Sequence, residues 1–432
     1  MKKNILLFSL SCFLAVSCEN PDVKNTDVDD VNDISDVSVD DIEFPAPIFI
    51  TLTDDERTMT GDCQDFAMKF FSTVYGDGKE ENIFVSPFSM SMALGVLRNG
   101  AEGETKREMQ EVLGMKDFSD QDINAYYKKL KEALITTDPT LKLAIANSVW
   151  YNKDRYMVKS DFADLSRTWF DTQITGLDYS DPAKAVATVN KWCEDNTNGL
   201  IKDMLKNLMP FEILNALYFK GDWSESYDFD VSKTKKEDFT KEDGSKIKAE
   251  LMNNKLTLPY YEDDYLSLTS VPYGNKAYSM YFVLPKENVT FSEMTAQLAE
   301  PDYWKQCLAW QYSAEVDISV PKFKIEYKNE ELKDILSRMG MEIACSPEAE
   351  YPHIANAEFI IARITQKTYI QVDEKGTEAA AVTEIGLVES AGGSDYETPK
   401  KTFRADRTFL FLIQERYTGT ILFMGKVGNP AE

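Results

Sequence analysis

The chain has 432 residues, of which 43% are hydrophobic and 12% are aromatic. This composition is typical of a globular protein and not of a disordered one, and large α+β folds hold chains of this length in a single domain. The formal net charge of -26 argues against nucleic acids and anionic membrane surfaces as binding partners.

The N-terminus has the features of a signal peptide over residues 1–17. Two lysines precede an apolar run, 5–16, that is too short to span a bilayer. The string Ala15-Val16-Ser17-Cys18 resembles a bacterial lipobox. That resemblance implies that Cys18 becomes the lipid-bearing first residue of the mature protein, anchored without a transmembrane helix. The alternative is an ordinary cleaved signal followed by an incidental cysteine.

An acidic segment, residues 18–47, follows the signal peptide. Its only basic residue between 19 and 43 is Lys24, set against the aspartates Asp22, Asp27, Asp29, Asp30, Asp33, Asp36, Asp40 and Asp41. Because such a segment cannot bury a core, we expect an extended, self-repelling tether. The folded domain is expected over residues 48–432.

The cysteines of this domain are scattered along the chain and show no C-x-x-C spacing: Cys63, Cys193, Cys307 and Cys345. The spacing therefore indicates neither a zinc site nor a disulfide framework. Buried free thiols are favoured over a single disulfide.

Hydrophobic periodicity and capping signals predict the elements of the domain. In chain order they are a helix from about Met59, a helix entered at Ser86-Pro87, a strand over 141–151, a helix over 183–196, strands over 213–223, 266–272, 278–285 and 315–325, a helix over 331–339, and a strand over 359–372. Ser86-Pro87 is a strong signal for the start of a helix, because serine caps a helix and proline is tolerated in its first turn. Asn215 lies inside an apolar strand, where an amide without a hydrogen bond would cost about 1–3 kcal/mol.

The stretch from Glu374 to Ala391 suits both a strand and a loop. As a strand, one face carries Thr377, Ala379, Ala381, Thr383, Ile385 and Leu387, and the other carries Glu378, Ala380, Val382, Glu384, Gly386 and Val388. The first face is typical of a strand on a core, and the second is expected to be solvated. Gly376, the alanine run and the Gly-Gly-Ser at 392–394 are typical of a loop. The sequence therefore indicates a segment that is a loop in one state and a central strand in another.

The string from Gly376 to Ala381 closely resembles the hinge of inhibitory serpins. Further strings resemble other segments of that family in the same order: Asn82–Leu94, Ile213–Trp223, Val320–Phe323, Phe403–Leu412 and Leu422–Val427. The resemblance covers roughly Thr53 to Pro430. It implies an α+β serpin fold with a large mixed main β-sheet, two smaller sheets, a helical layer and an exposed reactive loop at about 374–402.

The resemblance also implies a function. A protease would cut the reactive loop as if it were substrate, and the cut loop would enter the main sheet and trap the protease as an acyl complex. The family's spacing places the cut at Ser390-Ala391, with Glu389-Ser390 as the alternative. Small residues there suit serine proteases of the elastase or subtilisin type. The second hypothesis is a non-inhibitory serpin that acts as a binding or carrier protein on the bacterial envelope.

Particular residues receive roles from the same resemblance. The hinge comprises Glu374, Gly376, Thr377, Glu378, Ala379, Ala380 and Ala381. A cluster where the sheet opens comprises Ser86, Ser89, Asn215, Trp223, Lys322 and Gln366. Gln366 stands where the family often has a histidine, and we expect it to hydrogen-bond Asn215. Lys322 is expected to pair with Glu374 at the root of the hinge.

Catalytic chemistry has little support in the sequence. The single histidine, His353, has no nucleophile motif to serve and is too isolated to anchor a metal site, so we expect neither an enzyme, a metal nor a cofactor. The expected partners are target serine proteases and, through the lipid on Cys18, a membrane. We expect a monomeric outer-membrane lipoprotein, facing the periplasm or the cell surface.

Overall fold

The computed structural model describes residues 45–78, 80–356, 360–377 and 398–431. They belong to one compact unit spanning Phe44–Glu432. The predicted signal peptide, most of the tether, Cys18, the hinge residues 378–381 and both candidate cleavage sites lie outside the described residues. Among the helices of the described part, none combines the length and the apolar character needed to cross a bilayer.

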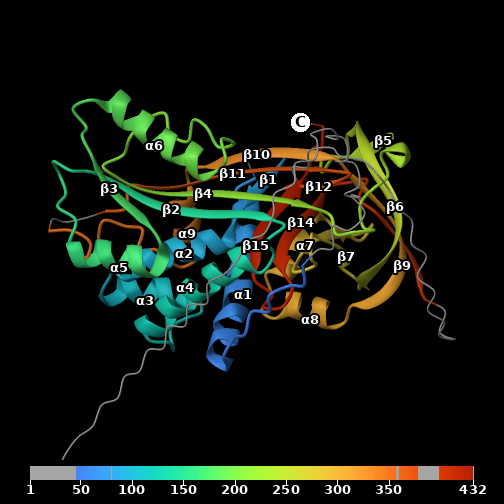
Figure 1. The fold of residues 1–432 in the computed structure, drawn as a ribbon, viewed down its shortest axis with the longest axis horizontal. Coiled ribbons are helices and arrows are strands. Elements are labelled where there is room, and N and C mark those ends of the chain that lie inside the picture. The colour runs from blue at the N-terminus through green and yellow to red at the C-terminus, as the bar shows by residue number, and fades with distance from the viewer. Residues whose placement is uncertain (1–44, 79, 357–359, 378–397, 432) are drawn as a thin grey trace, which may run out of the picture. The chain divides into compact units, whose positions relative to one another are not determined.

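Six strands form the main sheet. Their order is β10 (Phe323–Asn329), β11 (Arg363–Asp373), β12 (Gly376–Thr377), β4 (Phe211–Asp222), β2 (Lys142–Asn152) and β3 (Gln173–Leu177). β11 pairs antiparallel with β10 and parallel with β4, while β2 pairs antiparallel with β4 and parallel with β3. The sheet is therefore mixed, as expected, and Figure 1 shows its long strands side by side.

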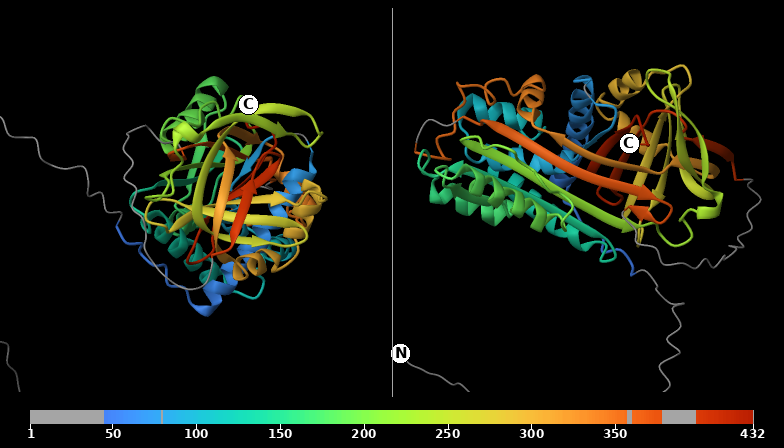
Figure 2. Two further views of the ribbon diagram at one scale, coloured as in Figure 1. Left: turned by 90° about the vertical axis from the view of Figure 1, so that its right-hand side faces the viewer. Right: turned by 90° about the horizontal axis from the view of Figure 1, so that it is seen from above.

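A second sheet has nine strands. Their order is β1 (Ile83–Val85), β15 (Ile421–Val427), β14 (Phe409–Glu415), β8 (Tyr278–Pro285), β7 (Leu266–Pro272), β6 (Lys246–Glu262), β9 (Tyr312–Pro321) and β13 (Lys400–Arg404), with β5 (Lys235–Thr240) paired to β6. β6 is 17 residues long and pairs with β5, β7 and β9. This shared strand joins the strands expected in two smaller sheets into one hydrogen-bonded network. Figure 2 shows β6 and its neighbours at one end of the main sheet.

Helices cover both faces of the main sheet. α6 (Pro182–Asn196) lies on one face, where Val189 and Cys193 pack against Trp150 of β2 and Leu214 of β4. α2 (Pro87–Arg98) is buried along its whole length and lies on the other face, as Figure 1 shows. The remaining helices are α1 (Asp54–Gly76), α3 (Gly103–Val112), α4 (Asp120–Thr136), α5 (Ser160–Phe170), α7 (Phe291–Leu298), α8 (Tyr303–Ala309), α9 (Leu332–Arg338) and the 3-10 turn η1 (Val231–Lys233).

Capping decides where two important helices begin. α1 starts at Asp54, five residues before the predicted start at Met59, because Thr53 and Glu56 form a capping box. α2 starts at Pro87 as predicted, and the Ser86 side chain accepts a hydrogen bond from the Ser89 N–H. This start fixes the positions of Ser86 and Ser89 beneath the main sheet.

The prediction of a single strand over 315–325 is wrong. The chain leaves the second sheet after Pro321 and enters the main sheet at Phe323, so β9 and β10 are separate strands. Lys322 lies between them, and its N–H donates to the Glu250 carbonyl of β6. The break is important because it places Lys322 at the junction of the two sheets, next to the hinge.

Candidate functional site: the opening of the main sheet

Two of the predicted hinge residues form a strand of the main sheet. Gly376 and Thr377, which make up β12, pair with Asp373 and Val372 of β11 on one side. On the other side they pair with Asp222 and Gly221 of β4. Elsewhere β11 pairs directly with β4, over Arg363–Lys367 and Glu212–Ala216. The main sheet is therefore open at one end, where β12 lies, and closed at the other.

Gly376 is required at its position. Its φ of +146° is a backbone conformation that side chains disfavour. A Cβ atom there would lie 2.3 Å from the Gly221 carbonyl oxygen and 2.7 Å from the Asp222 Cα. Both are backbone atoms that cannot move aside, so only glycine lets the chain turn between β11 and β4.

Thr377 is fully buried against the aromatic residues at the open end. Its hydroxyl lies 2.5 Å from the hydroxyl of Tyr273. Trp223 stacks on Tyr273, with ring centroids 4.5 Å apart. The Trp223 indole N–H donates to the Asp373 carbonyl (3.1 Å), and its backbone N–H donates to the Lys375 carbonyl (2.8 Å). Trp223 is thus a core aromatic that also holds both ends of the hinge turn.

Glu374 anchors the turn between β11 and β12. Its carboxylate accepts a hydrogen bond from the Thr234 hydroxyl (2.7 Å) and lies 3.1 Å from the Lys322 ammonium, so the expected contact with Lys322 is present. Burial alone would raise the pKa of Glu374, but these two partners and a backbone hydrogen bond lower it below the ordinary value of 4.5. The ionised form is therefore the one that the native turn favours.

Below the open end, the predicted polar residues lie close together under the main sheet. Ser86 Oγ donates to the Leu422 carbonyl (2.6 Å), and Ser89 Oγ donates to Asn147 Oδ1 (3.1 Å). Asn215 Nδ2 donates to the same Asn147 oxygen (2.5 Å). Asn147 is a member that the sequence reading missed, although it interrupts an apolar strand just as Asn215 does.

Gln366 belongs to this cluster but makes different contacts from those expected. Its side chain accepts from the Ser86 N–H (2.8 Å) and donates to the Ser86 carbonyl (3.0 Å). Gln366 and Asn215 are register partners in the parallel pairing of β11 and β4, yet no hydrogen bond joins their side chains among the described contacts. The expected bond to Asn215 is wrong, because the backbone N–H and carbonyl of Ser86, at the start of α2, satisfy both ends of the Gln366 amide.

The histidine and the four described cysteines lie outside this site. His353 is exposed, and its Nε2 lies 2.7 Å from Glu102 Oε1. The thiols of Cys63, Cys193, Cys307 and Cys345 are free. Burial raises the pKa of the Cys63 thiol to about 11 and the pKa values of the other three to about 12. The raised pKa values favour the protonated thiol at neutral pH.

Gly376 and Thr377 thus lie in the main sheet between β11 and β4. The serpin (serine protease inhibitor) family model matches residues 62–430. The chain belongs to the serpin family, and its α+β fold is the serpin fold. Membership places it in a family that in general inhibits proteases and does not catalyse reactions.

Relatives and solved structures agree with this assignment. An uncharacterized serpin-like protein of Thermococcus kodakarensis is 33% identical over 82% of this chain and 82% of its own. The crystal structure of the thermophilic serpin Tengpin in the native state is 27% identical, with a TM-score of 0.78 over 90% of this chain and 97% of that one. Thyroxine-binding globulin in complex with thyroxine is 28% identical, with a TM-score of 0.75 over 87% of this chain and all of the other.

Proposed function

We propose that this protein is a suicide-substrate inhibitor of serine endopeptidases of the elastase or subtilisin type. A protease cuts the reactive loop, and the loop then inserts between β11 and β4 and traps the protease as an acyl complex. The observation that carries the proposal is β12, because the described hinge residues already lie between these two strands.

The hydrogen bonding of the main sheet favours further insertion. The chain that enters at Gly376 runs antiparallel to both β11 and β4. Insertion exchanges one short parallel pairing for two antiparallel ones, which gains backbone hydrogen bonds and buries apolar side chains. Thr377 shows which face is buried, since it points to Tyr273 in the core. In a regular strand Ala379, Ala381, Thr383, Ile385 and Leu387 follow it on that face, and all of them are small or apolar.

The cleavage site remains the bond after Ser390, with the bond after Glu389 as the alternative. Ser390 and Ala391 are small, and shallow elastase-like pockets accept small side chains. A cut after Glu389 instead indicates a glutamate-preferring protease. Mass spectrometry of the C-terminal fragment released by elastase, subtilisin and a glutamyl protease decides between the two bonds.

One experiment tests the inhibitory mechanism. We expect elastase or subtilisin to form a complex with the wild type that survives denaturing electrophoresis, and loop cleavage to raise the melting temperature strongly. In Thr377→Arg the protein should be cut without forming the complex, because the position beside Tyr273 has no room for a buried charge. Thr377→Ser is the matched control. A stable complex with Thr377→Arg contradicts the mechanism.

A carrier function is the second candidate, and the similarity to thyroxine-binding globulin supports it. A carrier would bind a small molecule without trapping any protease. It is favoured if no protease tested forms a stable complex with the wild type, although each cuts the loop.

We further propose that lipid on Cys18 anchors a monomeric protein to the outer membrane of a bacterium, facing the periplasm or the cell surface. The support is the lipobox-like string before Cys18. Cys18→Ser should release the protein from the membrane fraction. Protease shaving of intact cells then distinguishes the two faces, since only surface display exposes the chain to the added protease.

A further inference from the structure

The closed end of the main sheet carries an unusual set of buried charges. We call the direct pairing of Arg363–Lys367 with Glu212–Ala216 the seam, and the side that faces α6 its outer face. Arg363, Thr365, Lys367 and Glu212 lie on this face, and none of them is more than 7% exposed. Charged side chains are rarely buried unless they are paired, so these residues need a structural explanation.

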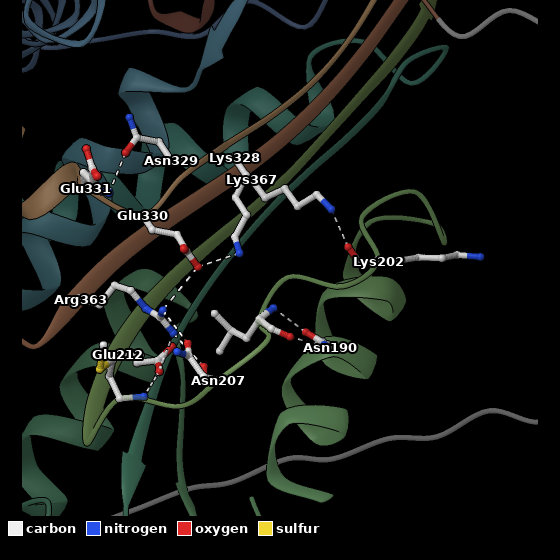
Figure 3. Close-up of polar contacts among 12 residues, drawn as sticks. Asn190, Lys202, Asn207, Glu212, Lys328, Asn329, Glu330, Glu331, Arg363 and Lys367 are labelled. Carbon is white, nitrogen blue, oxygen red and sulfur yellow. Dashed lines mark hydrogen bonds and ion pairs between the residues drawn. The ribbon is translucent and has the colours of Figure 1, made fainter. Parts of the chain in front are cut away.

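The contacts of the two cations span the seam and the connection between α6 and β4. Arg363 Nη2 lies 3.0 Å from Glu212 Oε1, its direct partner across the seam, and the guanidinium also donates to the side chain and carbonyl of Asn207 (3.0 and 2.9 Å). Lys367 Nζ donates to the Lys202 carbonyl (2.6 Å) and lies 2.6 Å from Glu326. Figure 3 shows Arg363 among Glu330, Asn207 and Glu212, with Lys367 reaching toward Lys202.

The closed seam leaves some of these polar groups unsatisfied. Among the described residues, Arg363 Nε, Thr365 Oγ1 and Glu212 Oε2 are buried without a hydrogen-bond partner. A buried donor or acceptor without a partner is costly, by about 1–3 kcal/mol each. Two of the three groups, Arg363 Nε and Thr365 Oγ1, are hydrogen-bond donors on β11. They could donate to an additional acceptor on the outer face of the seam.

The register of β12 identifies which loop residue would reach this place. Thr377 lies opposite Val372 and Gly221. If both ladders continue without a bulge, Glu384 lies opposite Thr365 and Leu214, and Gly386 lies opposite Arg363 and Glu212. Thr365 already pairs with Leu214 in the closed seam, and Arg363 pairs with Glu212, so neither strand has to shift its register. The seam only has to part.

We propose that Arg363, Thr365 and Lys367 form a receiving site for the carboxylate of Glu384 when the loop enters the seam. This inference rests on the proposed insertion mechanism. Arg363 and Lys367 flank Thr365 on the same face of β11, and diagonal neighbours about 7–8 Å apart are within reach of long side chains. Parting the seam separates Arg363 from Glu212, and Glu384 supplies the new negative charge.

Two further features of the loop fit this site. Gly386 has no side chain, so nothing is forced between the long side chains of Arg363 and Glu212. The outer face at this depth is not solvated as the sequence suggested, because Thr365 and Leu214 are both 0% exposed. A carboxylate delivered there needs a cation beside it. In the inserted strand the Glu384 carboxylate would therefore lie in a buried site beside cations, and not on a solvated face.

The test compares Glu384→Gln with Glu378→Gln. The second variant is a matched control, because the same register places residue 378 opposite Gln371 and Lys220, away from Arg363. We expect Glu384→Gln to lower the ratio of trapped complex to cleaved inhibitor by about threefold to tenfold, because glutamine can still accept a hydrogen bond but lacks the charge that roughly doubles its strength. Its melting temperature should also rise less on loop cleavage, while Glu378→Gln stays close to the wild type.

Repeating the substitution Glu384→Gln in the variant Lys367→Met shows whether its effect depends on the receiving site. In Lys367→Met, which keeps the long apolar stem, the further change Glu384→Gln should have a smaller effect than in the wild type. The receiving site is overturned if Glu384→Gln behaves like Glu378→Gln, or if its effect is undiminished in Lys367→Met. If the wild type neither traps a protease nor gains stability on cleavage, the proposed function fails, and the receiving site fails with it.

Discussion

Gly376 is the residue on which the inserted hinge depends. It has a positive φ and lies against the backbone of Gly221 and Asp222, where a side chain has no space. In the variant Gly376→Ala, the strained backbone and the clash should expel β12 from the main sheet. We expect the amide of Thr377 to lose its protection from hydrogen exchange, and cleavage as a substrate to increase several-fold over trapping.

Lys375→Ala is the control for this prediction. It changes the neighbouring turn residue, whose side chain lies near the surface and contacts Asp228 at 3.3 Å. Trp223 bonds only the backbone carbonyl of Lys375, so this variant should keep β12 in place. If the Thr377 amide is as well protected in Gly376→Ala as in the wild type, the steric argument is wrong.

Glu374 gives the hinge a dependence on pH. Because its pKa is lowered in the folded protein, its ionised form stabilises the native state relative to the unfolded chain. This contribution is complete above the ordinary value of 4.5 and is lost as the pH falls through the lowered native pKa. Melting temperatures of the wild type and Glu374→Gln should therefore differ by a constant amount above pH 4.5 and converge in more acidic solution.

Lys322→Ala separates the ion pair from the other contacts of Glu374. Lys322 is partly exposed, so the pair should contribute only about 0–1 kcal/mol. We expect the variant to lose activity on storage somewhat faster than the wild type, because one restraint on the hinge turn is gone. Equal rates of spontaneous inactivation would leave Thr234 as the partner that holds the turn.

At the scale of secondary structure, local patterns predicted best the elements with a clear apolar run or apolar periodicity. β7 and β8 have the predicted bounds, α6 starts one residue earlier than predicted, and α9 is one residue shorter at each end. β6 was missed because its exposed half is rich in lysine, glutamate and asparagine, and its pattern of burial is irregular. A strand that three neighbours stabilise does not need strong periodicity of its own.

The candidate site was only partly predictable, because the burial of some of its residues depends on tertiary contacts. Asn215 stood out as a polar residue in an apolar strand, and the resemblance to serpins placed Ser86 and Ser89 beside it. Arg363 and Lys367 were not singled out, because they lie at alternate positions of β11, the pattern of a strand with one exposed face. Their burial depends on the connection between α6 and β4, and Glu212, the charge partner of Arg363, lies 151 positions away in sequence. Such a pairing is decided by tertiary structure, and a single sequence contains no direct signal of it.

For the whole molecule, the four described cysteines provide a measure of how tightly the native state is packed. Their raised pKa values predict little thiolate at neutral pH. We expect Cys63, Cys193, Cys307 and Cys345 to react with iodoacetamide only after unfolding, and peptide mapping by mass spectrometry to find each one unmodified in the native protein. Rapid labelling of Cys193 would instead show that α6 separates from the main sheet in the native state.

The shortness of β12 has a kinetic consequence for the molecule. Starting a hairpin is slow, because the turn must close before any ladder forms, whereas lengthening an existing one adds a residue at a time. Here the turn at Glu374-Lys375 is already closed and the first rungs on both sides are occupied. In the proposed mechanism, a protease therefore meets a molecule that is past nucleation. Trapping then depends on whether the strand lengthens faster than the acylated enzyme is released.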